Sequence, residues 1–411
     1  MTKRTQVESY RADSRRSLGC TRAIREILRC RALPRVLALL AILSVDAPGS
    51  IAQTRLNRFE TRYYIIHTDL SAADVREAEV RISRIAEEYH ARTKSFAGQI
   101  VQKLPFYLFS RHEDYLAAGG LPGSAGVFMG DKLMATVPTG NLGNPWYIIQ
   151  HEGFHQFADA VIRGDLPPWV NEGLAEYFER AVFTGDGYVA AVIPPVDLAR
   201  VKRWLEDGRF KSMRDMMTLG REVWNHQMSR ENYDQAWSMV HFLAHADNGR
   251  YQGTFDRFLR ETGRGRPWQL AWEKTFGRGV GEFEAQWRDY WLNLPDDPTA
   301  KLYARATVAT LTSFLARAVS QGQRFGTVEE FFKTASQGGL KSHPDDWLPP
   351  SILNRALRSA KRTGTWTFAA RGGALPRLTC ELEDGATLVG AFKMAKRKVK
   401  SVSVTEGRSR R

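Results

Sequence analysis

Cysteine is scarce in this chain, which has only three in 411 residues. Cys20 and Cys30 lie near the N-terminus, and Cys380 stands alone in the remainder of the sequence. Without its N-terminal region the chain would have no internal disulfide, and its stability would depend on a hydrophobic core. The chain is long enough to bury a large core, and we expect more than one domain.

Long hydrophobic runs are lacking as well. The apolar stretch Val36–Val45 has ten residues, whereas a membrane-spanning helix needs about 20. Arginines precede this stretch and Ser50-Ile51-Ala52 follows it, which predicts a secretory signal peptide over residues 1–52; an uncleaved anchor is the alternative. No cysteine directly follows the stretch to support a lipoprotein anchor. We therefore expect a secreted or periplasmic bacterial protein with no transmembrane segment in the mature chain.

Acidic residues are outnumbered by basic ones, and the formal net charge is +14. Residues 1–52 hold ten Lys or Arg and four Asp or Glu, so about +8 would remain after their removal. A positive balance favours anionic cell-envelope polymers or acidic substrates. The most basic run, Lys393–Lys400, could bind nucleic acid or an envelope polymer. A solvated tail is the simpler interpretation, and we expect no specific nucleic acid partner.

The clearest chemical motif is the sequence His-Glu-Gly-Phe-His at residues 151–155. Residues four apart lie on the same face of a helix, so His151 and His155 can bind one metal ion. Glu152 would lie beside that ion, where a general base for a metal-bound water belongs. The alternative is a pair of core histidines that are hydrogen-bonded to backbone carbonyls.

A second helix is predicted from Pro168 onward, with an acidic face made of Glu172, Glu176 and Glu179. Catalytic zinc commonly has three protein ligands, and His-His-Glu is one of the standard sets. We predict that a short turn folds this helix back, so that Glu172 becomes the third ligand of one zinc ion. Glu176 would then accept a hydrogen bond from His151. A solvated carboxylate face is the alternative interpretation.

At these residues the chain resembles the gluzincin metallopeptidases, the clan that includes thermolysin and the aminopeptidase N-like enzymes. The resemblance is strongest over residues 58–290. Residues 168–177, Pro-Trp-x-x-Glu-Gly-Leu-Ala-Glu-Tyr, are similar to secreted bacterial peptidase-MA-like domains of unknown function. The resemblance implies zinc ligands at His151, His155 and Glu172, a general base at Glu152 and a supporting acidic residue at Glu176.

In the aminopeptidase branch a tyrosine on a later helix stabilises the oxyanion, and Tyr233 is similar to it in placement. Tyr233 could instead be a core residue, and His226 and His241 are substitutes, since a histidine can also polarise an oxyanion. The Gly-Ala-Met-Glu-Asn segment of the aminopeptidases is missing, which argues against exopeptidase activity. By resemblance, Gly123–Phe128 in the comparable place could be an edge strand that binds extended substrate; a Gly-rich turn is the alternative.

The order of predicted elements indicates an α+β fold in three parts. A small mixed β-sheet occupies residues 53–143, and a mainly helical region with tryptophans in its core occupies residues 144–294. By resemblance, this helical region is expected to be a zinc-binding catalytic part like that of thermolysin or the aminopeptidases. A helix stop over 294–298 separates these two parts from a C-terminal α+β accessory module, residues 300–411. The predicted sheet region has strands over 63–68 and 104–110, helices over 72–95 and at Tyr115, and a hairpin over 127–137. The accessory module has helices over 302–319 and 328–335 and strands over 365–369, 378–382, 387–392 and 399–404.

The leading hypothesis is a secreted zinc-dependent peptidase. Glu152 would take the proton of the zinc-bound water and pass it to the leaving amine of a peptide or protein substrate, while Tyr233 binds the oxyanion. One alternative is a catalytically silent, zinc-containing envelope binding or scaffold protein. Another is an amidase or peptidase that acts on peptidoglycan peptides. Other divalent metals also suit a nitrogen-oxygen site.

Overall fold

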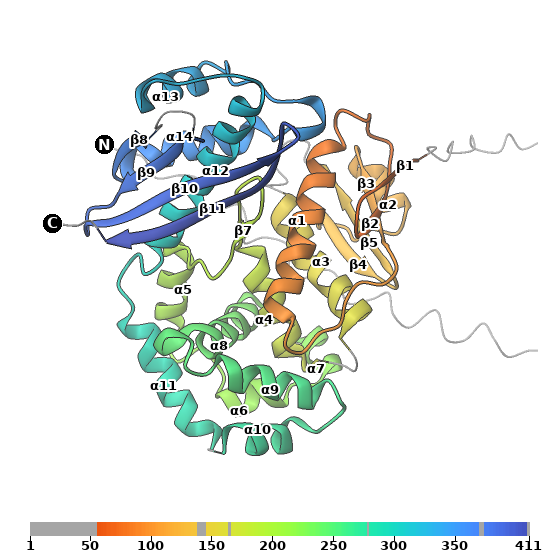
Figure 1. Ribbon diagram of the computed structural model, residues 1–411. Helices are drawn as coiled ribbons and strands as arrows, with labels where there is room; N and C mark the ends of the chain where they lie inside the picture. The colour runs from red at the N-terminus through yellow and green to blue at the C-terminus, as the bar shows by residue number, and fades with distance from the viewer. Residues whose placement is uncertain (1–55, 138–144, 163–165, 278, 370–373, 409–411) are drawn as a thin grey trace, which may run out of the picture. The chain divides into compact units, whose positions relative to one another are not determined.

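The computed structural model describes residues 56–137, 145–162, 166–277, 279–369 and 374–408. These residues form a mixed α+β structure, which confirms the predicted fold class (Figure 1). The predicted signal peptide, residues 1–52, lies outside the described residues. Among the described residues, no helix combines the length and the apolar character needed to cross a membrane.

The N-terminal part contains a five-stranded sheet with the order β1-β2-β3-β5-β4. β2, β3 and β5 are parallel to one another, and the edge strands β1 and β4 are antiparallel to their neighbours. The predicted strands and hairpin are confirmed, whereas β1 was not predicted. The strands are β1 (Asn57–Glu60), β2 (Tyr64–Thr68), β3 (Leu104–Phe109), β4 (Gly126–Met129) and β5 (Lys132–Thr136).

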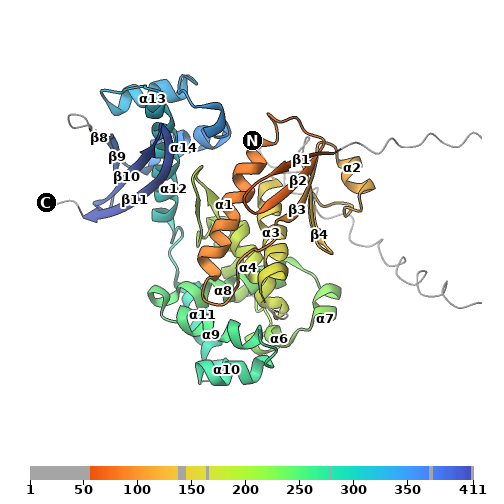
Figure 2. The same ribbon diagram turned by 45° about the vertical axis from the view of Figure 1, so that its right-hand side comes forward.

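Alternating side chains of this sheet enter two different hydrophobic clusters, because successive residues of a strand point to opposite faces. Leu133 and Ala135 of β5 join the main core together with helices α1 (Arg76–Thr93) and α3 (Pro145–Val161). Met134 between them packs with Tyr115 of the short helix α2 (His112–Ala117). The sheet therefore has α1 and α3 on one face and α2 on the other (Figure 2).

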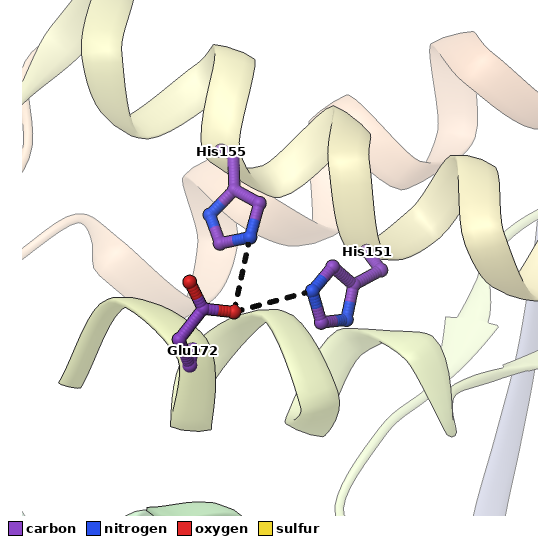
Figure 3. Close-up of side chains that lie close together, drawn as sticks. All are labelled: His151, His155 and Glu172. Carbon is purple, nitrogen blue, oxygen red and sulfur yellow. Dashed lines mark ion pairs between the residues drawn. The ribbon is translucent and has the colours of Figure 1, made fainter. Parts of the chain in front are cut away.

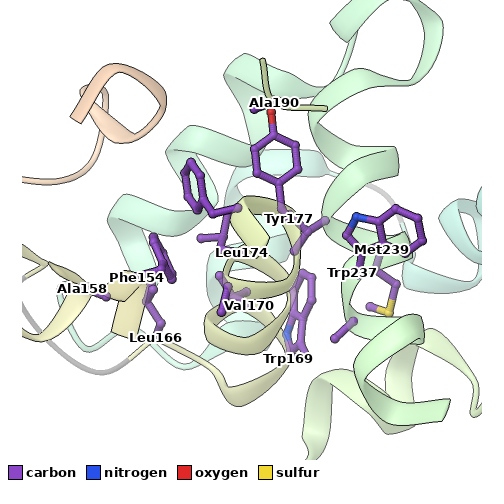
Figure 4. Packing of buried hydrophobic residues seen from close by; sticks show 14 of the residues in the cluster. Phe154, Ala158, Leu166, Trp169, Val170, Leu174, Tyr177, Ala190, Trp237 and Met239 are labelled. Atoms are coloured by element: carbon purple, nitrogen blue, oxygen red, sulfur yellow. The ribbon is translucent and has the colours of Figure 1, made fainter. Parts of the chain in front are cut away.

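Helix α4 (Pro168–Glu179) follows α3 and packs against both α3 and α8 (Arg230–Gly249). Its first residue is a proline, whose fixed φ and missing N–H suit the start of a helix. Its apolar side is buried as predicted, as Figure 4 shows for Trp169, Val170, Leu174 and Tyr177. The acidic side is thereby turned toward the histidine-bearing face of α3.

The region after α4 is mainly helical, as predicted, but it begins with a two-stranded hairpin that was not predicted. The hairpin strands are β6 (Val182–Phe183) and β7 (Tyr188–Val189), each too short to show a period. The tryptophans of this region lie in the core, Trp268 only in part. The further helices are α5 (Pro195–Glu206), α6 (Met213–Thr218), α7 (Arg221–His226), α9 (Gln252–Thr262), α10 (Trp268–Phe276) and α11 (Val280–Asn293).

The C-terminal region is α+β, as predicted, and its antiparallel sheet has the order β11-β10-β9-β8. Helix α12 packs on this sheet (Figure 1). The helix stop over 294–298 is confirmed, while α14 was not predicted. The elements are α12 (Ala300–Ser320), α13 (Val328–Ser336), η1 (Pro344–Asp346), α14 (Pro350–Thr363), β8 (Thr365–Ala369), β9 (Arg377–Glu381), β10 (Ala386–Ala395) and β11 (Lys398–Arg408).

The β6–β7 hairpin holds α12 beside the end of α4. Phe183 of β6 packs in one cluster with Leu311 and Phe314 of α12. Asp186, at the turn of the hairpin, accepts hydrogen bonds from the buried Arg317 of α12 at 2.8 and 3.1 Å. A buried, bidentate ion pair of this kind holds the hairpin and α12 in one relative position, because separating the partners would leave an uncompensated buried charge. The C-terminal region is therefore packed close to the site helices.

Candidate metal centre

Three predicted ligand side chains converge between α3 and α4 (Figure 3). Oε2 of Glu172 lies 3.4 Å from Nε2 of His151 and 3.3 Å from Nε2 of His155. The two imidazole rings are close to perpendicular, with an interplanar angle of 78°. All three side chains are mostly buried, with exposed fractions of 12–16%. The turn before α4 thus brings Glu172 onto the histidine pair, as the spacing predicts.

These atoms have the spacing that a small divalent cation requires. In a tetrahedral site with ligand bonds of about 2.0–2.1 Å, neighbouring ligand atoms lie about 3.3 Å apart. The two nitrogen-to-oxygen distances agree with that value. The three side chains could therefore hold a metal ion. The set of two imidazoles and one carboxylate suits a transition metal better than calcium or magnesium, which take oxygen ligands.

Glu152 directly follows His151 on α3, and its side chain points toward the edge of the five-stranded sheet. Its Oε2 accepts a hydrogen bond of 2.9 Å from the backbone N–H of Phe128, on the edge strand β4. This contact leaves Oε1 of Glu152 available to another group. The predicted substrate-binding segment Gly123–Phe128 thus ends on a strand whose open edge faces the motif. Binding of an extended peptide to that edge stays a prediction.

The carboxylate nearest to the other ring nitrogen of His151 belongs to Glu179. Oε2 of Glu179 lies 3.0 Å from His151 Nδ1, whereas Oε1 of Glu176 lies 3.9 Å from it. The role predicted for Glu176 is therefore filled in the structure by Glu179, the last residue of α4. Helical spacing in the sequence could have identified this residue, since Glu179 is seven positions after Glu172 and lies on the same face of the helix.

Glu176 instead belongs to a buried ion network behind the site. Its Oε2 accepts a hydrogen bond of 2.5 Å from Arg180, and its exposed fraction is 3%. Arg180 also binds Asp197 of α5 at 2.8 Å and Asp234 of α8 at 3.3 Å. These contacts tie α4 to α5 and α8. His151, Glu176 and Glu179 form a second group that could hold a metal ion, but Glu176 is already paired with Arg180.

The carboxylates around His151 favour its charged form. Burial opposes protonation of this ring, but its hydrogen bonds to Glu172 and Glu179 outweigh burial and hold its pKa well above the ordinary value. Burial also opposes the charge of Glu172, but the two histidines lower its pKa overall. A metal ion would have to displace the proton from His151, so its binding would release a proton.

Tyr233 of α8 lies close to His151. Its ring centroid lies 6.2 Å from that of His151, and its ring packs edge-on against Trp224 of α7. The hydroxyl contacts Met228 Sδ at 3.4 Å. Burial and the negative charge of Glu172 raise the pKa of Tyr233. The hydroxyl therefore keeps its proton at neutral pH and can donate a hydrogen bond.

The two histidines named as substitutes for Tyr233 lie elsewhere. His226 is exposed at the end of α7. His241 is buried, and its Nε2 lies 3.2 Å from the Ala191 carbonyl oxygen, to which it donates a hydrogen bond. Within the described parts of the chain, no hydrogen bond, ion pair or ring contact joins either of them to His151, His155 or Glu172.

A cavity of about 370 Å³ adjoins the cluster. Its walls include Phe128 of β4, His155 of α3, and Asn171 and Glu172 of α4. Two of the three candidate ligands thus face a space that is large enough for small-molecule or peptide groups. The site is open to a ligand from this side, as a catalytic metal centre must be.

Comparison with known proteins adds little to this geometry. A search of curated proteins finds no match to the chain. Residues 147–269 match a family model that is described as a protein of unknown function, DUF1570. The matched segment contains the three candidate ligands, Glu152, Glu176, Glu179 and Tyr233, whereas Phe128 lies outside it.

Proposed function

We propose that this protein is a secreted zinc-dependent metallopeptidase of the gluzincin type. The observation that carries the proposal is the convergence of His151, His155 and Glu172 at distances that fit one tetrahedral ion, with Glu152 on the adjacent helix position. The resemblance of residues 151–155 and 168–177 to gluzincins supports it. When bound, zinc supplies a Lewis acid that lowers the pKa of a water molecule toward about 7.

In this proposal the carboxylate of Glu152 would move the proton. Oε2 is held by the Phe128 N–H, so Oε1 can accept a proton from the attacking water and return it to the leaving nitrogen. Tyr233, which stays protonated, would donate a hydrogen bond to the oxygen of the scissile carbonyl as negative charge develops there. An extended substrate would pair with the open edge of β4 and fill the cavity beside His155.

Zinc content and hydrolysis of the purified protein, measured together, test the proposal. We expect one zinc per chain and release of peptides from casein or from purified peptidoglycan sacculi; comparing the two identifies the substrate class. The Glu152→Gln variant should keep zinc and lose hydrolysis, while Glu113→Gln, on the exposed side of α2, should behave as wild type. Zinc-loaded wild-type protein that cleaves neither substrate would favour a catalytically silent binding protein.

A further inference from the structure

A second cavity, of about 410 Å³, lies toward the other end of the two site helices. On α3, the first cavity is lined by residues after His151. The second cavity is lined by Tyr147, one helical turn before His151, and by Glu179 at the end of α4. Glu179 lines this cavity and also holds His151. A helical turn spans about 5.4 Å, so a group in the cavity would lie within about two peptide residues of the metal ligands.

The opposite wall of this cavity comes from the C-terminal region. Tyr303 and Thr307 of α12 and Ile352 and Arg355 of α14 line it. This wall is fixed by the Asp186–Arg317 pair, which holds α12 against the β6–β7 hairpin. The C-terminal region is thus part of a cavity that borders the candidate metal centre.

The charged groups of the cavity leave one arginine without an acidic partner. Glu179 is held by His151, and Asp197 binds both Arg180 and Arg200. Arg355 is exposed, and among the described residues no acidic group forms an ion pair with it. The remaining lining is largely aromatic and aliphatic. Apolar walls with a guanidinium at the rim suit a side chain that has an apolar stem and a carboxylate head.

We propose that this cavity binds a carboxylate-bearing side chain of the substrate close to the scissile bond, and that Arg355 is the specificity-determining residue. This inference rests on the proposed peptidase function, because it assigns the cavity to the substrate of the same metal centre. It gives the C-terminal region a role in substrate selection.

Peptide binding to the zinc-loaded Glu152→Gln variant tests the inference without turnover. The probes are alanine-based hexapeptides that contain one phenylalanine and differ only in having glutamate or glutamine at one position. We expect the best glutamate peptide to bind about tenfold more tightly than its glutamine counterpart, the value of a charge-assisted contact of about 1.4 kcal/mol. Adding Arg355→Gln should abolish this preference, and Arg355→Lys should retain part of it.

Arg358 provides the matched control, because it is exposed on the same helix and does not line the cavity. Arg358→Gln should keep the full preference for glutamate. Equal binding of the glutamate and glutamine peptides to the parent protein, including no binding of either, would overturn the inference, as would a preference that survives Arg355→Gln.

Hydrolysis of the same peptides by zinc-loaded protein that retains Glu152 separates the two proposals. Cleavage that is indifferent to glutamate and to Arg355→Gln would leave the peptidase function standing and remove the role of the cavity. An Arg355-dependent binding preference without any cleavage would retain the cavity as a binding site and remove the peptidase function.

Discussion

The imidazole of His151 is held by Glu179, whose Oε2 lies 3.0 Å from Nδ1 of the ring. The opposite nitrogen, Nε2, faces Glu172. A histidine that donates its remaining N–H to a carboxylate is fixed in orientation and tautomer, and its other nitrogen becomes a stronger ligand. The last residue of α4 therefore orients His151 so that its Nε2 could bind a metal ion.

Removing this carboxylate should weaken metal binding. For Glu179→Ala we expect a loss in zinc affinity of about 10–100-fold, the usual effect of deleting a partner of a ligand histidine. Glu179→Gln should lose less, because the amide oxygen can still accept the hydrogen bond. Competition with a chelating dye measures both. Unchanged affinity in Glu179→Ala would contradict the assignment.

Glu176, which was predicted to have this role, should behave differently. Its carboxylate is buried against Arg180, so Glu176→Gln leaves part of a buried charge uncompensated. We expect the free energy of unfolding to fall by about 3 kcal/mol, with a smaller effect on zinc affinity than Glu179→Ala has. Denaturant unfolding and the same dye competition decide this. A larger loss of zinc affinity in the Glu176 variant would restore the prediction made from the sequence.

Tyr233→Phe tests the oxyanion contact. The ring packing against Trp224 is retained, while the hydroxyl is lost. We expect kcat to fall about 100–1,000-fold, with zinc content and the KM of peptide substrates little changed. Steady-state kinetics with a fluorogenic peptide measures the effect. A wild-type kcat in the variant would show that Tyr233 does not bind the oxyanion and would favour its interpretation as a core residue.

Gly173 lets α4 and α8 approach each other closely. A Cβ atom at this position would lie 2.5 Å from the Ala236 carbonyl oxygen and 2.7 Å from Val240 Cγ2. Gly173→Ala should therefore lower the free energy of unfolding by about 1–3 kcal/mol through overpacking. Gly187→Ala is the control, since an added Cβ there meets nothing within 4 Å. Equal unfolding midpoints for the two variants would refute this account of the packing.

Two histidines of α8 should make the protein less stable in acid. Burial lowers the pKa of His241 to about 4 and that of His245 to about 3, against an ordinary value of 6.5. As pH falls below about 6.5, the unfolded chain binds these protons and the folded chain does not. Their contribution to stability is thus complete above pH 6.5 and is lost as pH falls toward about 4 for His241 and about 3 for His245, by up to about 1.4 kcal/mol per pH unit and histidine.

His241→Gln isolates one of these groups, because the amide N–H can replace the hydrogen bond to the Ala191 carbonyl. Unfolding in urea between pH 7 and pH 4.5 should show a shallower loss of stability for the variant than for the wild type. Parallel curves would mean that the His241 pKa is not depressed in the folded protein.

Several features were predictable because they depend on residues close together in the sequence. The four-residue spacing of His151 and His155 requires only a helix, and the proline at the start of α4 fixes where the next helix begins. The short apolar runs that form β2 and β3, and the hairpin pattern over 127–137, predicted the strands of the sheet. Helix α14 and the β6–β7 hairpin were not predicted; β6 and β7 are two residues each, too short for periodicity to show.

The sequence by itself thus determined the fold class, through the local patterns of its helices and strands. It also determined the histidine pair and the candidate third ligand, because helical periodicity places these side chains on one face of their helices. Only the tertiary structure decided which acidic residue holds His151. Glu176 and Glu179 share that face, and the choice depends on Arg180, which draws Glu176 into the ion network with α5 and α8. The cavity beside Glu179 also forms only in the tertiary structure. Its walls come from helices more than a hundred residues apart in the sequence, and no local pattern encodes such a contact.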